Sequence, residues 1–238
     1  MRLRYLAAAL LLLGAAPANA VDINILTVTG TWIDIDPNAL PGSSGLGTNE
    51  IRWGQPTTNP QSGYRFDGNA PQTFALGSGA TLGTFTHYNF PINAGSSITG
   101  ATLALSISFT APDLFLGTKV LNSQFIFSHN ETSNITPPAG CCPDIVTAVL
   151  NPAQTDLFSF NGIDYAFGVT GFQVGNTNFV QFSSPEGGTN QAFLRGTFAD
   201  VTQFAVPGPA AGAGIPGLIA ACGGLFALIR RRRRQAVA

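Results

Sequence analysis

The chain contains two histidines, His87 and His129, and a carboxylate or amide side chain lies two residues after each of them. Two imidazoles and a carboxylate such as Glu131 form a donor set that binds metal ions. Such a site needs three or four converging ligands, and the sequence does not show that these residues meet. The simpler interpretation, which the sequence favours, is that His87 and Asn89 hydrogen-bond loop backbone and hold an edge in shape.

A second candidate metal site consists of alternating oxygen donors. Asp34, Asp36 and Asn38 resemble the start of a calcium-binding loop, because calcium prefers carboxylate and carbonyl oxygens. The pattern departs from an EF-hand, since Ala39 stands where that loop needs glycine and no glutamate stands at its final position. Two interpretations remain open, a calcium site and a set of solvated turn residues.

Cys141 and Cys142 are adjacent and directly precede Pro143. An oxidising compartment would permit a disulfide between them, but adjacent cysteines can pair only through a strained ring. Free thiols and intermolecular bonds are the alternatives, since the third cysteine, Cys222, lies in an apolar segment. A catalytic cysteine would need a nearby histidine and an electropositive setting, which an acidic loop does not provide.

The motifs of common enzyme classes are absent from the sequence. It has no Gly-x-Ser-x-Gly nucleophile elbow and no Gly-Lys-Ser or Gly-Lys-Thr phosphate loop. A glycosidase needs only two carboxylates, and with 12 acidic residues in the chain that class is not excluded. We expect a protein that is not an enzyme and that uses no cofactor, apart from the calcium considered above.

The charges are distributed unevenly along the chain. Residues 21–206 contain all 12 acidic residues and only four basic ones, so this part carries a net charge of −8 with histidine neutral. Binding to nucleic acid needs lysine and arginine against the phosphates, and an acidic domain is repelled by them. The sequence therefore argues against a nucleic-acid partner.

Both ends of the chain have the composition of export and membrane segments. Residues 1–20 combine two arginines, an apolar run and Ala18-Asn19-Ala20, which predicts a secretory signal peptide cleaved after Ala20. Residues 212–229 are apolar or glycine except for Pro216, and this length is near the lower limit for a transmembrane helix. The arginines at 230–234 would stay on the cytoplasmic side, so the acidic domain would face outward.

The part between these ends has the pattern of strands and turns. Short β-branched and aromatic runs alternate with clusters of Gly, Asn, Pro and Ser. Residues 102–110 alternate with a period of two, and Asn161-Gly162 is a type I′ hairpin signal. Residues 21–206 are therefore predicted to form one all-β domain, a two-sheet antiparallel β-sandwich of jelly-roll type. The expected strands are 23–29, 63–67, 98–110, 119–127, 144–150, 157–160, 163–169, 179–182 and 192–204, with long loops at 35–51 and 134–143.

The C-terminal segment, residues 207–234, resembles the PEP-CTERM sorting signals of Gram-negative bacteria. It joins a short proline motif, an apolar helix and an arginine cluster, although Gly208 stands where the commonest form has glutamate. The resemblance implies that the exported chain is first anchored in the inner membrane facing the periplasm. It also implies that exosortase, a membrane transpeptidase-like enzyme, then sorts the chain toward the cell surface, often together with exopolysaccharide. The residues that carry the resemblance are Val206, Pro207, Gly208, Pro209, Arg230, Arg231 and Arg232.

The ectodomain, residues 21–206, also resembles a known group. The stretch 84–92 contains Thr86-His87-Tyr88-Asn89, and with Ile51-Arg52-Trp53-Gly54 and Ser62-Gly63-Tyr64-Arg65-Phe66 upstream it is similar to the THxN type of PEP-CTERM proteins and to choice-of-anchor ectodomains. The matching motif positions are Thr86, His87 and Asn89. That group has no established activity, so the resemblance supplies no catalytic residue.

Three functions are compatible with these observations, in decreasing order of support. The first is a non-enzymatic envelope or extracellular-matrix protein associated with exopolysaccharide or biofilm. The second is a calcium-assisted carbohydrate-binding module, in which Trp32, Trp53 and Tyr64 would stack against sugar rings, although aromatic side chains more often form the core. The third is a hydrolase, which would need two carboxylates facing each other in a cleft.

Overall fold

The computed structural model describes residues 21–38, 40–56, 60–114, 116–132 and 143–201. No helix within these ranges has both the length and the apolar character to cross a membrane. Several predictions fall on residues outside them. These are the signal peptide with Ala20, the cysteines Cys141 and Cys142, the apolar segment 212–229, and the sorting residues Val206, Pro207, Gly208, Pro209, Arg230, Arg231 and Arg232.

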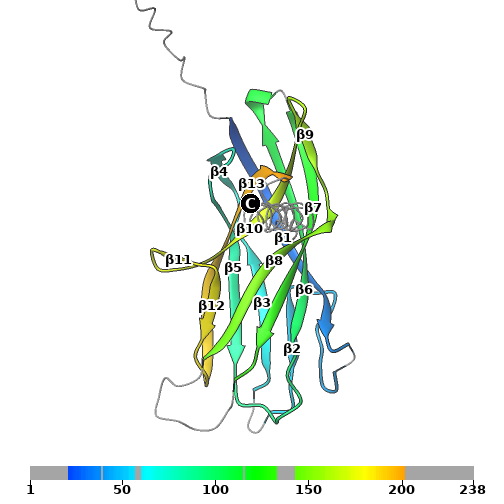
Figure 1. The fold of residues 1–238 in the computed structure, drawn as a ribbon, viewed down its shortest axis with the longest axis vertical. Coiled ribbons are helices and arrows are strands. Elements are labelled where there is room, and N and C mark those ends of the chain that lie inside the picture. Colours follow the sequence, from blue (N-terminus) through cyan, green and yellow to red (C-terminus); the bar gives the residue numbers. More distant parts are fainter. Residues whose placement is uncertain (1–20, 39, 57–59, 115, 133–142, 202–238) are drawn as a thin grey trace, which may run out of the picture.

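The described residues form a β-sandwich-like, all-β fold of two antiparallel sheets (Figure 1). One sheet has the strand order β12-β8-β7-β6-β1-β4, and the other has the order β11-β10-β13-β5-β3-β2 with β9 paired to β10. The strands are β1 (Asp22–Asp36), β2 (Glu50–Trp53), β3 (Ser62–Gly68), β4 (Gln72–Ala75), β5 (Ala80–Asn89), β6 (Gly100–Ala111), β7 (Leu116–Asn130), β8 (Asp144–Thr155), β9 (Phe158–Phe160), β10 (Ile163–Val174), β11 (Thr177–Phe179), β12 (Gln181–Ser184) and β13 (Gly188–Asp200).

Local sequence patterns account for several of these elements. β6 alternates buried and partly exposed residues along its whole length, as its period of two predicts. Asn161 and Gly162 have φ angles of 51° and 75° and join β9 to β10. Positive φ at both central residues is what a type I′ turn requires, so that hairpin prediction is confirmed.

The first strand is longer than its sequence pattern predicts. β1 continues to Asp36 and pairs with β6 as far as Asp36↔Gly100, with register shifts between Ile25 and Thr27 and between Trp32 and Asp34. The bulges let an irregular pattern stay paired to a long neighbouring strand. The expectation of a loop beginning at residue 35 was therefore wrong by two residues.

This extension also changes the surroundings of the predicted calcium loop. Asp34 and Asp36 are strand residues, and the Asp36 carboxylate accepts a hydrogen bond of 2.6 Å from the Thr99 hydroxyl. With its amide nitrogen facing these acceptors, Asn38 donates to Asp34 Oδ1 and to the Ile35 carbonyl. The calcium site stays a prediction, but its residues already use oxygen atoms in local hydrogen bonds.

The interior between the sheets is rich in aromatic side chains. Trp32, Trp53 and Tyr64 are each 0% exposed. Tyr64 lies 5.3 Å from Trp32 and 4.7 Å from Trp53, measured between ring centroids. The suggestion that these three rings stack against sugars was wrong, because no ligand can reach a side chain that is wholly inside the core.

Candidate metal centre

The two histidines enter the interior from opposite sheets. His87 lies on β5, where it shares the inward face with Phe85 and Asn89, and all three are 0% exposed. His129 lies near the end of β7 and continues the inward alternation of Phe125 and Phe127. The rings meet with their centroids 5.3 Å apart. Period-two alternation therefore points both imidazoles into the same space between the sheets.

A buried carboxylate completes this group. Asp144 is the first residue of β8, and its Oδ2 lies 3.7 Å from His129 Nε2 and 4.0 Å from His87 Nε2. The side chains of His87, His129 and Asp144 are all 0% exposed. One ligand atom from each of the three lies within 4.8 Å of the other two, so these side chains converge and form a candidate metal site.

Two further carboxylates join Asp144 on the more accessible side. Glu131 follows β7 directly, and its Oε2 lies 3.1 Å from His129 Nε2 with 18% of its side chain exposed. Glu186 lies in the turn between β12 and β13 and is partly buried. The carboxylates of Glu131, Asp144 and Glu186 form a second group whose ligand atoms are within 4.8 Å of one another.

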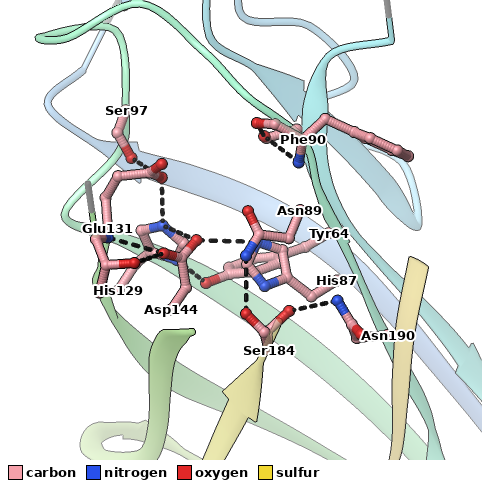
Figure 2. Close-up of polar contacts among 12 residues, drawn as sticks. Tyr64, His87, Asn89, Phe90, Ser97, His129, Glu131, Asp144, Ser184 and Asn190 are labelled. Atoms are coloured by element: carbon pink, nitrogen blue, oxygen red, sulfur yellow. Dashed lines mark hydrogen bonds and ion pairs between the residues drawn. The ribbon is translucent and has the colours of Figure 1, made fainter. Parts of the chain in front are cut away.

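Hydrogen bonds hold most of these side chains in place, as Figure 2 shows. The Tyr64 hydroxyl is 2.5 Å from His129 Nδ1, on the side of the ring away from Asp144. The backbone N–H of Thr132 donates to Asp144 Oδ1 over 2.8 Å, and the Ser97 hydroxyl donates to Glu131 Oε2 over 2.9 Å. Partners of this kind orient metal ligands in known metal sites.

Other polar atoms lack a hydrogen-bond partner in the cluster formed by His87, Asn89, His129, Glu131, Asp144 and Glu186. Nine buried side-chain polar atoms of the described residues have no hydrogen bond, and seven of them belong to this cluster. Each such atom costs about 1–3 kcal/mol when left without a partner. The seven are both ring nitrogens of His87, Oδ2 of Asp144, Oδ1 of Asn89, Oε1 of Glu131, and Oε1 and Oε2 of Glu186. Apart from any ring nitrogen or carboxyl oxygen that carries a proton, these atoms are electron-pair donors, so a cation among them would satisfy several at once.

The pKa values reflect this concentration of buried groups. Burial, followed by the nearby His129, lowers the pKa of His87 well below its ordinary value, so its ring is neutral and has a lone pair. Burial, followed by the charge of Glu131, raises the pKa of Asp144 to about 8. Burial also raises the pKa of Glu186, which the charge of Glu131 raises further, although the nearby Asn89 side chain lowers it. Buried carboxylates without a positive partner, as in this cluster, would be stabilised by a bound cation.

The outcome differs from the interpretation that the sequence favoured. That interpretation had His87 and Asn89 bonding to loop backbone, whereas His87, on β5, makes no hydrogen bond to backbone within the described residues. Asn89 does donate to a backbone carbonyl, that of Ser184, over 2.8 Å. Thr86 lies on the other face of β5, where its hydroxyl accepts a hydrogen bond from Gln191, and it takes no part in the cluster.

The sequence indicates His87, His129 and Glu131 as a candidate donor set but not Asp144 and Glu186. An acidic residue that opens an apolar strand, as Asp144 does, was the available signal. Nothing local marks Glu186, because its approach depends on the turn between β12 and β13. No protein-family model matches this chain, and no curated protein matches it.

The three carboxylates also bear on the hydrolase hypothesis. They do face one another, but the Asp144 side chain is 0% exposed and is hydrogen-bonded to Thr132. A glycosidase must bring a sugar between its two carboxylates. A buried Asp144 prevents that approach, so this cluster suits a small ion better than a glycan.

Proposed function

We propose that this protein is an exported, non-enzymatic protein of the cell envelope or extracellular matrix whose β-sandwich domain holds a metal ion. The observation that carries the metal part is the convergence of seven buried polar atoms without hydrogen-bond partners at His87, Asn89, Glu131, Asp144 and Glu186. No organic ligand is needed to explain such a set, because one cation can satisfy several lone pairs together.

The ion would act as a structural connection. β5 belongs to one sheet, and β7 and β8 belong to the other, so ligands from His87, His129 and Asp144 would join the two sheets. Structural metal sites are closed by protein ligands, whereas catalytic sites keep a position open for substrate. The complete burial of these three side chains supports the structural role.

The cellular part of the proposal rests on the ends of the chain. A signal peptide at residues 1–20 and a PEP-CTERM-like segment at residues 207–234 would bring the domain across the inner membrane and present it to exosortase. Membership of the THxN type, the jelly-roll variant of the sandwich, and an association with exopolysaccharide or biofilm stay predictions. A net charge of −8 on the outward domain agrees with an envelope protein that does not bind nucleic acid.

The alternative, a calcium-assisted carbohydrate-binding module, has lost its main support. Trp32, Trp53 and Tyr64 are inside the core and cannot contact a glycan. No other observation in the described residues favours sugar binding over metal binding.

The proposal is tested on protein purified from its native host, with and without exosortase. Intact mass should give a mature start at Val21 and the loss of the chain beyond about Pro207. Elemental analysis of the same sample should find about one metal ion per chain. The Asp144→Asn variant should lose the ion, while Asp156→Asn, which changes an exposed carboxylate that accepts hydrogen bonds from Asn122, should keep it.

Two results would count against the proposal, each on a different part. Protein that carries no metal after gentle purification, and takes none up on addition, would refute the metal centre. A chain retained in the inner membrane through Arg234 would instead refute sorting and leave a permanently tethered periplasmic domain.

A further inference from the structure

The chemical class of the ion can be read from the donor atoms. The cluster offers two imidazoles and up to three carboxylates, of which the imidazoles and Asp144 are fully buried. Calcium and magnesium are bound almost entirely by oxygen. Imidazole nitrogen is a ligand preferred by zinc, iron, copper and nickel. At a site that uses only oxygen ligands, neither buried imidazole would bind the ion. The donor set therefore favours a transition ion.

Three distances between donor atoms are compatible with a single ion of this class. Zinc binds nitrogen and oxygen at about 2.0–2.2 Å, so two ligands of one ion are at most about 4.0–4.4 Å apart. His129 Nε2 lies 3.1 Å from Glu131 Oε2 and 3.7 Å from Asp144 Oδ2. His87 Nε2 lies 4.0 Å from Asp144 Oδ2. All three separations fall within that limit, and none is short enough to exclude an ion between the atoms.

Tyr64 determines which nitrogen of His129 faces the ion. Its hydroxyl occupies Nδ1 at 2.5 Å, which leaves Nε2 directed toward Asp144 and Glu131. The Tyr64 ring is itself 0% exposed and packs on Trp32 and Trp53, so the hydroxyl has little freedom to move. A rigid partner on the far ring nitrogen fixes both the orientation of an imidazole and the nitrogen that binds metal.

We infer that this centre takes a first-row divalent transition ion such as Zn²⁺ in preference to Ca²⁺ or Mg²⁺, with Nε2 of His129 as a ligand and Tyr64 as its positioning residue. The inference rests on the proposed metal-binding function and adds the class of ion and the residue that orients a ligand. Glu131 and Glu186, on the more accessible side, form a second group with Asp144 and place negative charge beside the ion.

The test is a titration of the metal-free full chain with Zn²⁺, Co²⁺, Mn²⁺, Ca²⁺ and Mg²⁺. Zn²⁺ and Co²⁺ should bind more tightly than Ca²⁺ and Mg²⁺, and Co²⁺ should give visible absorption bands that report nitrogen ligands. Tyr64→Phe should weaken Zn²⁺ binding by about 10- to 100-fold and shift the Co²⁺ bands. Tyr165→Phe, at a partly buried tyrosine that stacks on Phe158, is the matched control and should change neither.

The possible results distinguish failure of the inferred ion class or of the Tyr64 role from failure of metal binding itself. Tighter binding of Ca²⁺ or Mg²⁺ than of Zn²⁺ would overturn the inferred class of ion and leave a metal centre in place. Unchanged affinity and bands in a folded Tyr64→Phe variant would overturn the positioning role. If that variant does not fold, NMR of the histidine ring signals in the Co²⁺ form of the unaltered chain decides whether His129 is a ligand. Absence of His129 from the ligands would overturn the positioning role. Binding of none of these ions would refute both the inference and the proposed metal function.

Discussion

Removal of the ion should lower the thermal stability of the protein by a predictable amount. A ligand that binds only the folded state stabilises it by about 4 kcal/mol when its free concentration is 1,000 times Kd. For a domain of this size, each 1 kcal/mol corresponds to about 2–4 °C in Tm. Chelation should therefore lower Tm by about 8–16 °C relative to that saturating condition.

The seven polar atoms without partners are the structural reason to expect that the folded state binds the ion. In the metal-free protein these atoms stay buried, since His87, His129 and Asp144 connect two sheets that remain packed through the aromatic core. The loss should thus appear as a lower Tm of one cooperative transition and not as separation into two transitions. Differential scanning calorimetry with added Zn²⁺ and with EDTA measures both properties.

The control for this prediction is the Asp144→Asn variant, which removes the shared carboxylate but keeps its shape. Its Tm should respond to neither Zn²⁺ nor EDTA, and the response of Asp156→Asn should match that of the unaltered chain. If the unaltered chain has the same Tm in Zn²⁺ and in EDTA, the convergence of these side chains does not reflect a metal centre.

Three further predictions concern pH, the core and a turn. In the metal-free protein the folded state keeps the Asp144 proton up to about pH 8, whereas the unfolded chain releases it near pH 3.8. The free energy of unfolding should therefore decrease as the pH rises from about 3.8 to about 8. The slope should be up to about 1.4 kcal/mol per pH unit, and urea unfolding of metal-free Asp144→Asn should lack this contribution; equal slopes would contradict the assignment. Phe85→Ala should lower the free energy of unfolding by about 3–5 kcal/mol, because Phe85 is 0% exposed among aromatic rings, and a loss below about 1 kcal/mol would show that the core is packed differently. Gly162→Ala should cost about 1–2 kcal/mol in the same assay because its φ is 75°, and an unchanged midpoint would argue against the type I′ turn.

The predictions about the fold that were confirmed depend only on residues close together in the sequence. The alternation in β6 and the Asn161-Gly162 turn need only a few consecutive residues, because side-chain period and left-handed backbone are local properties. The end of β1 was missed because its last residues pair with β6, whose partner register is not visible in either segment alone.

The same division applies to the candidate site. The residue types at His87, His129 and Glu131 pointed to metal chemistry, since imidazole and carboxylate are the usual ligands. Whether they met could not be judged, because Asp144 reaches them only through the pairing of β7 with β8 and the packing of β5 opposite. The simpler interpretation, in which His87 hydrogen-bonds loop backbone, failed for that reason.

The strand content and the acidity of the domain follow from the sequence alone, because strand period and charge are properties of consecutive residues and of composition. The expectation of exported and anchored ends also comes from the sequence, since it follows from the order of charged and apolar segments. The meeting of two histidines from opposite sheets with a buried carboxylate depends on how the two sheets pack. The physical reason is that alternation places a side chain on the inner face of its sheet, whereas strand order, register and the approach of the second sheet decide which side chain it meets there.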